Sequence, residues 1–158
     1  MRVVSLKHFF SFSSFVSVYI GINSIALSEE MSQLNGKCVQ LVAVGVNYSK
    51  NCQSRIVSID YGNGRNGYWF FVKDGSILSF AGEKNKIIFN PNGSAVQSID
   101  QVTFASKGGP ESPSTAVAVG SCSLTNPYRG KAVTVCKARI TGGAAFLGSF
   151  RSNGFPPH

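Results

Sequence analysis

The sequence predicts an all-β fold: a single-domain antiparallel β-sandwich or small barrel of about seven to nine short strands, after an N-terminal signal peptide. Short runs of β-branched and aromatic residues recur along the chain, and Gly, Asn and Pro separate them. No stretch keeps the apolar spacing of a helix over several turns. All four cysteines follow the expected signal peptide, as in small exported domains that carry disulfides.

Residues 1–28 have the pattern of a secretory signal peptide. Arg2 and Lys7 give a positive start, an apolar but serine-rich run follows, and the small residues Ala26 and Ser28 provide a cleavage pattern. The alternative is a membrane anchor of roughly 20 residues. Serine and asparagine side chains dilute the apolar run, which favours export and removal. We therefore expect a periplasmic or extracellular protein with no transmembrane segment in its mature chain.

The mature chain has the length of one domain of ordinary size. Residues 29–37 are mostly polar and are expected to form a flexible leader. Residues 38–152 are expected to form the all-β domain, and residues 153–158 a frayed tail.

The even number of cysteines in an exported chain predicts two disulfides. Three connectivities are possible, and we favour the two pairs that are local in sequence, Cys38 with Cys52 and Cys122 with Cys136. In the chain-entropy model a bridge over a loop of this length stabilises the fold by about 3 kcal/mol. A zinc site is the alternative, but no Cys-x-x-Cys is present and the only histidine of the mature chain is His158. No metal site is predicted.

The most strongly strand-forming stretch runs from residue 68 to residue 80 and is interrupted by Asp74-Gly75. This dipeptide suits a two-residue type I′ turn. Such a turn would place Tyr68, Phe70, Val72 and Ile77 on one face and Trp69, Phe71, Leu78 and Phe80 on the other. Because both faces are apolar, we expect this hairpin in the middle of a sheet.

The other expected strands are separated by polar or Gly- and Pro-containing turns, and they cover residues 39–46, 55–61, 86–89, 96–104, 116–124, 131–141 and 144–150. Alternation in the second of these predicts a buried side made of Val57, Ile59 and Tyr61. Cys122 and Cys136 are symmetric about Arg129, which predicts that they face each other across a hairpin. The same side of the returning strand then carries Ala132, Thr134, Ala138 and Ile140.

Residues 62–67 match G-x-G-x-x-G, but a nucleotide fingerprint needs a helix after the last glycine and the sequence continues as a strand. No cofactor is predicted. Amide and guanidinium groups beside aromatic rings suit sugars or acidic groups, so we interpret this loop as a candidate binding site made of Tyr61, Asn63, Arg65, Asn66 and Tyr68. A second loop of similar character carries Tyr128 and Arg129. The sequence does not decide whether the two loops share one end of the domain.

Few residues are available for catalysis. Without an internal histidine, Ser-His-Asp and Cys-His arrangements are excluded, and no catalytic residue is assigned. A carboxylate pair for glycoside cleavage would come from Asp60, Asp74, Glu83, Asp100 and Glu111. Of these, only Asp60 and Asp100 lie on expected strands.

The chain is basic, with 15 Lys and Arg against 7 Asp and Glu. This excess either attracts anionic surfaces or serves solubility alone. Lys131, Lys137 and Arg139 lack stacking aromatic neighbours, so nucleic acid is not an expected partner. We predict a non-catalytic exported binding protein whose partner is an envelope glycan, an anionic surface or another protein. The alternatives are a hydrolase acting on a saccharide through acidic residues, and a structural envelope protein that binds anionic polymer or lipid.

Overall fold

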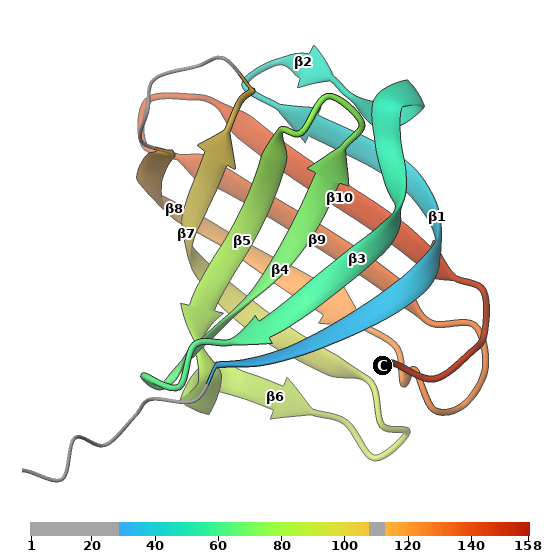
Figure 1. Cartoon of the computed structure of the whole chain (residues 1–158). Helices are drawn as coiled ribbons and strands as arrows, with labels where there is room; N and C mark the ends of the chain where they lie inside the picture. The colour runs from blue at the N-terminus through green and yellow to red at the C-terminus, as the bar shows by residue number, and fades with distance from the viewer. Residues whose placement is uncertain (1–28, 108–112) are drawn as a thin grey trace, which may run out of the picture.

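The computed structural model describes residues 29–107 and 113–158, so the expected signal peptide lies outside the described residues. The described chain is almost entirely β (Figure 1). Its elements are β1 (Glu30–Ala43), β2 (Val46–Asn47), the 3₁₀ turn η1 (Ser49–Asn51), β3 (Cys52–Asp60), β4 (Arg65–Val72), β5 (Ile77–Glu83), the 3₁₀ turn η2 (Lys84–Lys86), β6 (Ile87–Phe89), β7 (Ala95–Ala105), β8 (Ser114–Leu124), β9 (Val133–Ile140) and β10 (Ala145–Ser152).

Eight of these strands form a closed antiparallel barrel, which confirms the small barrel among the two expected architectures. The strands pair in the order β10-β9-β8-β7-β5-β4-β3-β1, and β1 pairs with β10 to close the ring. Neighbours in the barrel are also neighbours in sequence, as in an up-and-down barrel. The two remaining strands are accessory: β2 pairs with the end of β1, and β6 pairs with β7 outside the ring.

The central hairpin is present, but its register differs from the prediction by one residue. Val72 N donates to Ser76 O at 2.8 Å and Gly75 N donates to Val72 O at 3.0 Å, so the loop has three residues, 73–75. Gly75 has a φ of +95°, the left-handed conformation that closes this type of loop. The pairs are therefore Phe71 with Ile77 and Tyr68 with Phe80.

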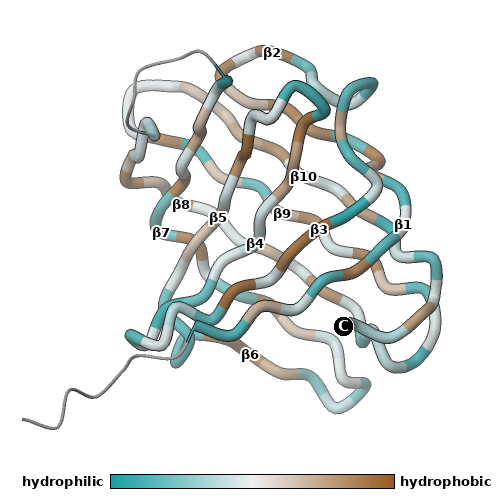
Figure 2. The backbone as a smooth tube through the Cα atoms, viewed as in Figure 1, coloured by the Kyte–Doolittle hydropathy of each residue, from teal (hydrophilic) through white to brown (hydrophobic). Residues whose placement is uncertain are grey.

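This shift changes which side chains face the core, because a slip of one residue exchanges the two faces of a strand. Tyr68, Phe70 and Val72 are buried in the barrel with Leu78 and Phe80. Trp69 and Phe71 face outward instead, contrary to the expected grouping. The expectation that the hairpin is central is correct, since β4 and β5 each have a strand on both sides. Figure 2 shows the most apolar residues of β4 and β5 toward the hairpin that joins them.

The centre of the barrel is filled by aromatic rings. Phe70, Phe80 and Phe150 are fully buried, and the rings of Phe70 and Phe80 meet edge to face with their centroids 5.8 Å apart. Phe70 reaches across to β10, where it packs on Gly148. A Cβ atom at position 148 would lie 2.6 Å from two carbons of the Phe70 ring. The bare backbone of Gly148 therefore makes room for this side chain.

Both disulfides have the local pairing that we favoured. Cys122 and Cys136 are direct cross-strand partners with their Cα atoms 4.0 Å apart, as the symmetry of the hairpin predicts. The predicted inner side of β9 is also confirmed, because Thr134 and Ala138 are buried together with Cys136.

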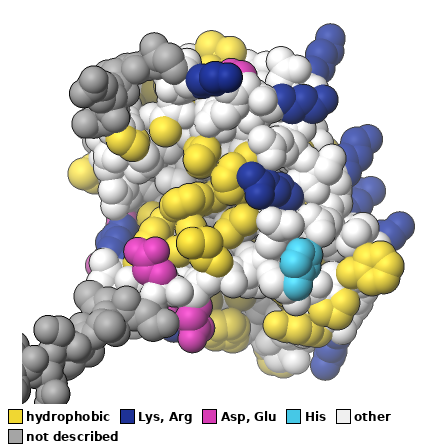
Figure 3. Space-filling view, in the orientation of Figure 1, with side chains coloured by type: hydrophobic (Ala, Val, Ile, Leu, Met, Phe, Trp, Pro, Cys, Tyr) yellow, Lys and Arg dark blue, Asp and Glu magenta, His cyan; other side chains and the backbone are white. Residues whose placement is uncertain are grey.

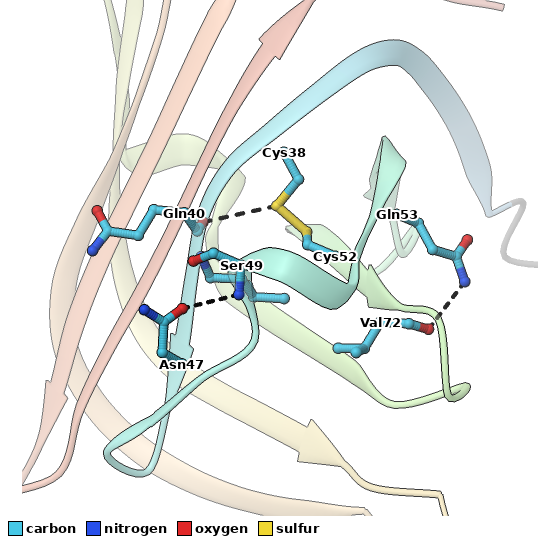
Figure 4. The surroundings of a disulfide bond; sticks show 8 residues. Cys38, Gln40, Asn47, Ser49, Cys52, Gln53 and Val72 are labelled. Atoms are coloured by element: carbon cyan, nitrogen blue, oxygen red, sulfur yellow. Dashed lines mark hydrogen bonds between the residues drawn. A yellow bond between two sulfur atoms is a disulfide. The ribbon is translucent and has the colours of Figure 1, made fainter.

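The Cys38–Cys52 disulfide joins β1 to β3 where their hydrogen-bonded ladder has ended (Figure 4). The last paired residues of that ladder are Asn35 and Arg55. Beyond this point Ser49 Oγ accepts from Leu41 N at 2.9 Å, which fastens η1 to β1. The disulfide therefore holds β1 and β3 together beyond the last backbone pair of their ladder.

Both ends of the described domain are more ordered than the sequence suggests. Most of the expected leader is strand, since β1 begins at Glu30 and pairs with β3 through residue 35. The tail is fastened to the same strand: Gln33 N donates to His158 O at 2.8 Å and Asn153 N donates to Asn35 O at 2.9 Å. The sequence pattern does not reveal this strand, because its outer face is exposed to water and carries polar side chains.

Candidate ligand-binding groove

The two loops singled out in the sequence lie at the same end of the barrel. Consecutive strands of the meander run in opposite directions, so the connections after β3 and after β8 both fall at the end where β1 begins and β10 ends (Figure 1). We call this the loop end. The two loops therefore share one end of the domain, which the sequence alone does not decide.

The predicted site residues are divided among three places at the loop end. Tyr61, Asn63 and Arg65 line a groove of about 300 Å³ on the outer surface, together with Ser79, Ala81, Gln101 and Thr103. Asn66 and Tyr68 alternate with Arg65 along β4 and point into the barrel. Tyr128 and Arg129 lie on the other loop, and neither lines this groove.

Tyr61 packs against two neighbours on β4, Gly67 and Trp69. A Cβ atom at position 67 would lie 2.8 Å from Tyr61 Oη and 3.3 Å from its Cε2, so the ring fits only because Gly67 has no side chain. The indole of Trp69 donates its Nε1–H to Tyr61 Oη at 3.0 Å. The groove therefore has a wall made by an aromatic ring whose position is fixed, and we call this ring the Tyr61 platform.

The guanidinium of Arg65 is also fixed in place. It forms a two-pronged ion pair with Asp100, and its Nη2 donates to Gln101 Oε1 at 3.3 Å. Hydrogen bonding to Asp100 raises the pKa of Arg65. Because the carboxylate compensates the positive charge, this groove is suited to neutral groups that exchange hydrogen bonds rather than to anions.

The two carboxylates considered for glycoside cleavage each have a cationic partner. Asp60 forms an ion pair with Lys84, and Asp100 forms one with Arg65. The hydrogen bond from Lys84, supported by the Gly62 amide, lowers the pKa of Asp60. A general acid in glycoside hydrolysis needs a raised pKa, so Asp60 does not meet that requirement.

An apolar surface adjoins the groove on the outer face of β3 and β4 (Figure 3). Trp69 and Phe71 pack edge to face with centroids 6.3 Å apart, and the Arg55 guanidinium lies 4.2 Å from the centroid of Phe71. Val57 and Ile59 are buried, as alternation predicts, but they lie on this outer face. On β3 the side chain of Ile56 is buried inside the barrel, and Ile56 alternates with the predicted buried side.

The barrel interior at the loop end holds a cavity of about 130 Å³, lined by Ser32, Leu34, Ile56, Ser58, Tyr68, Leu124, Pro127, Thr134 and Pro157. Burial raises the pKa of Tyr68 to about 12, partly offset by a hydrogen bond with Asn66. Gln97 is fully buried and donates to Asn66, while its Oε1 has no hydrogen-bond partner among the described residues. Ordinary ligand pockets measure roughly 300–1,000 Å³, so this cavity is too small for a sugar chain.

Four residues of the groove escaped sequence reasoning: Ser79, Ala81, Gln101 and Thr103. They come from β5 and β7, and they reach Tyr61 through the register of these strands, in which Ser79 is opposite Thr103. Their outward direction follows from alternation. No signal in the sequence specifies which strand lies beside the Tyr61 loop.

No family model, curated protein or solved structure matches this chain at a significant level. Within residues 29–107 and 113–158, no helix is long and apolar enough to cross a membrane. The fold and the groove therefore define a class: a small antiparallel β-barrel with two disulfides and an aromatic-walled groove on its outer surface.

Proposed function

We propose that the protein is an exported, non-catalytic binding protein that holds a neutral saccharide in the groove beside the Tyr61 platform. The observation that carries this proposal is the fixed position of the Tyr61 ring over Gly67, with its hydroxyl hydrogen-bonded to Trp69. A rigid aromatic ring offers contact area at little cost in conformational entropy, which suits the apolar face of a sugar ring.

The polar groups of the groove complement sugar hydroxyls. Asn63 and Gln101 carry amides, and Ser79 and Thr103 carry hydroxyls, so both donors and acceptors surround the platform. Arg65 is neutralised by Asp100, which favours an uncharged ligand. The volume of about 300 Å³ is at the lower limit of ordinary ligand pockets. We therefore propose that the groove receives a single sugar unit, such as the end of an envelope glycan.

Export is supported by the two disulfides, because such bonds persist in oxidising compartments. We propose a periplasmic or extracellular location, where glycans of the cell envelope are accessible. The absence of a catalytic role is supported by the ion pairs that neutralise Asp60 and Asp100.

A panel of neutral oligosaccharides tests this proposal, with the purified disulfide-bonded protein and calorimetric titration of the best ligand. Tyr61→Ala should weaken binding by roughly tenfold, because one stacking contact is worth about 1 kcal/mol or more. Tyr61→Phe keeps the ring and should retain most of the affinity. Tyr128→Ala is the matched control, since that side chain is 74% exposed on the other loop. Failure of every neutral saccharide to bind, or equal losses in Tyr61→Ala and Tyr128→Ala, would refute the proposal.

A further inference from the structure

Two like charges face each other directly on the outer surface of the barrel. Lys37 on β1 is the cross-strand partner of Arg151 on β10, at the seam that closes the ring. Like charges in this position destabilise a sheet. Lys37, Arg151 and Lys131 together line one hollow on this surface. All three side chains are exposed, and among the described residues none of them forms an ion pair.

The surroundings of this pair lack negative side chains. Residues 113–158 contain no Asp or Glu, and they contribute five cations, Arg129, Lys131, Lys137, Arg139 and Arg151. In Figure 3 most of the visible acidic side chains lie at the lower left of the molecule, and several Lys and Arg side chains lie along its right edge. The field over the β9–β10–β1 side is therefore positive and has no compensating side-chain carboxylate within residues 113–158.

The cations line two hollows that share one lysine. The first hollow measures about 580 Å³ and is lined by Asn35, Gly36, Lys37, Ser54, Lys131, Arg151, Ser152 and Asn153. Its floor requires Gly36, because a side chain there would overlap the carbonyl oxygen of Arg151. A second hollow of about 270 Å³ contains Arg129 and shares Lys131 with the first. We call these two hollows, with Lys37, Arg151, Lys131 and Arg129, the basic track.

We propose that the basic track binds a linear acidic polysaccharide, with carboxylate or sulfate groups on Lys37, Arg151, Lys131 and Arg129. Two hollows joined through one lysine fit an extended chain better than a single small anion. Between the cations the lining offers amides and hydroxyls, which hydrogen-bond to sugar hydroxyls. This site is separate from the groove beside Tyr61, and neither proposal depends on the other.

The chemistry of the lining favours a polysaccharide over the other polyanions. Neither hollow contains an aromatic side chain for stacking on nucleic-acid bases. The larger hollow contains no apolar side chain for insertion into a lipid layer. Anionic membranes and nucleic acids are therefore outcomes that the experiment must separate from the proposal.

Binding of polygalacturonate and of dextran sulfate, measured across a series of salt concentrations, tests the proposal, with neutral dextran as the blank. The triple variant Lys37→Gln/Lys131→Gln/Arg151→Gln should lose about tenfold or more in affinity for at least one of these polymers. The slope of log affinity against log salt should become shallower by roughly one for each cation removed. The matched control is Lys50→Gln/Lys73→Gln/Lys107→Gln, which removes the same charge at the opposite end of the barrel.

An unfolding midpoint at or above that of the wild type shows that the triple Gln variant is folded, because the substitutions are on exposed side chains and remove the repulsion between Lys37 and Arg151. Lys37→Arg/Lys131→Arg/Arg151→Lys keeps the three charges and should bind like the wild type. Equal losses in the two Gln triple variants would overturn the proposal in favour of a general charge effect. Stronger binding to phosphatidylglycerol vesicles or to duplex DNA than to both polysaccharides would overturn it in favour of that partner. Binding of polysaccharide that is unchanged in the Gln triple variant at 37, 131 and 151 would also overturn it.

Discussion

Tyr61 and Gly67 are packed so closely that the hydroxyl of the tyrosine lies 2.8 Å from the point where a Cβ atom of residue 67 would stand. This contact is between the beginning of the β3–β4 connection and the strand β4 that follows it. Together with the hydrogen bond from the Trp69 indole, it positions the aromatic wall of the groove. The shape of the groove therefore depends on the absence of a side chain at position 67.

Gly67→Ala should displace the Tyr61 ring and break its hydrogen bond with Trp69. Saccharide affinity should fall about as far as in Tyr61→Ala. The overpacking should also lower the free energy of unfolding by about 1–3 kcal/mol. Trp69 is the only tryptophan of the chain, so its fluorescence reports directly on the loss of the Tyr61 contact. An emission spectrum and an affinity identical to those of the wild type would show that the ring is not held in this way.

The two disulfides should differ in their local effects although they close loops of the same length. Replacing either pair by alanines should cost about 3 kcal/mol of unfolding free energy in urea. Loss of Cys122–Cys136 should leave its neighbourhood ordered, because β8 and β9 are paired on both sides of it. Loss of Cys38–Cys52 should raise amide exchange in η1 and in the end of β1, where no β1–β3 pairing remains. Similar exchange patterns in the two double variants would contradict this distinction.

The hairpin between β8 and β9 shows what sequence reasoning can establish. The positions of Cys122 and Cys136 about Arg129, together with alternation along the strand, are local information, and they correctly predict a cross-strand disulfide. The hairpin between β4 and β5 shows the limit. Gly75 suits a loop of two residues and a loop of three, and only the packing of the barrel selects the second.

The same limit applies to the groove. Tyr61, Asn63 and Arg65 stand out in the sequence because they are close together in one loop. Gln101 and Thr103 belong to a strand that reaches the loop only through the pairing of β5 with β7. The register of β7 against β8 is irregular after Ile99. Simple alternation along β7 is therefore not sufficient to predict the direction of these side chains. Long-range register is thus the information that the sequence pattern lacks.

The contact between Phe70 and Gly148 should limit substitution in the middle of the barrel. Gly148→Ala places a methyl group 2.6 Å from the Phe70 ring and should destabilise the protein by about 1–3 kcal/mol. Phe70→Leu removes the clash and leaves space, so the two substitutions should be less costly together than the sum of their separate effects. Urea unfolding of the two single variants and the double variant measures this coupling. Strict additivity would show that the ring and the glycine do not interact.

Tyr68 should make the protein lose stability in alkaline solution. Burial raises its pKa to about 12 in the folded state, against 10.0 as the ordinary value. Above pH 10 the unfolded chain loses this proton while the folded protein retains it, so the stabilising contribution is complete below pH 10 and declines as the pH rises toward 12. Between pH 9 and pH 11 the loss from this group should be about 1.4 kcal/mol.

Tyr68→Phe should remove this part of the decline, as measured by urea unfolding at both pH values. Tyr128→Phe is the control, because it removes the same hydroxyl from a side chain that is largely exposed. If the wild type and Tyr68→Phe lost equal stability over this range, the tyrosine hydroxyl would not be desolvated inside the barrel.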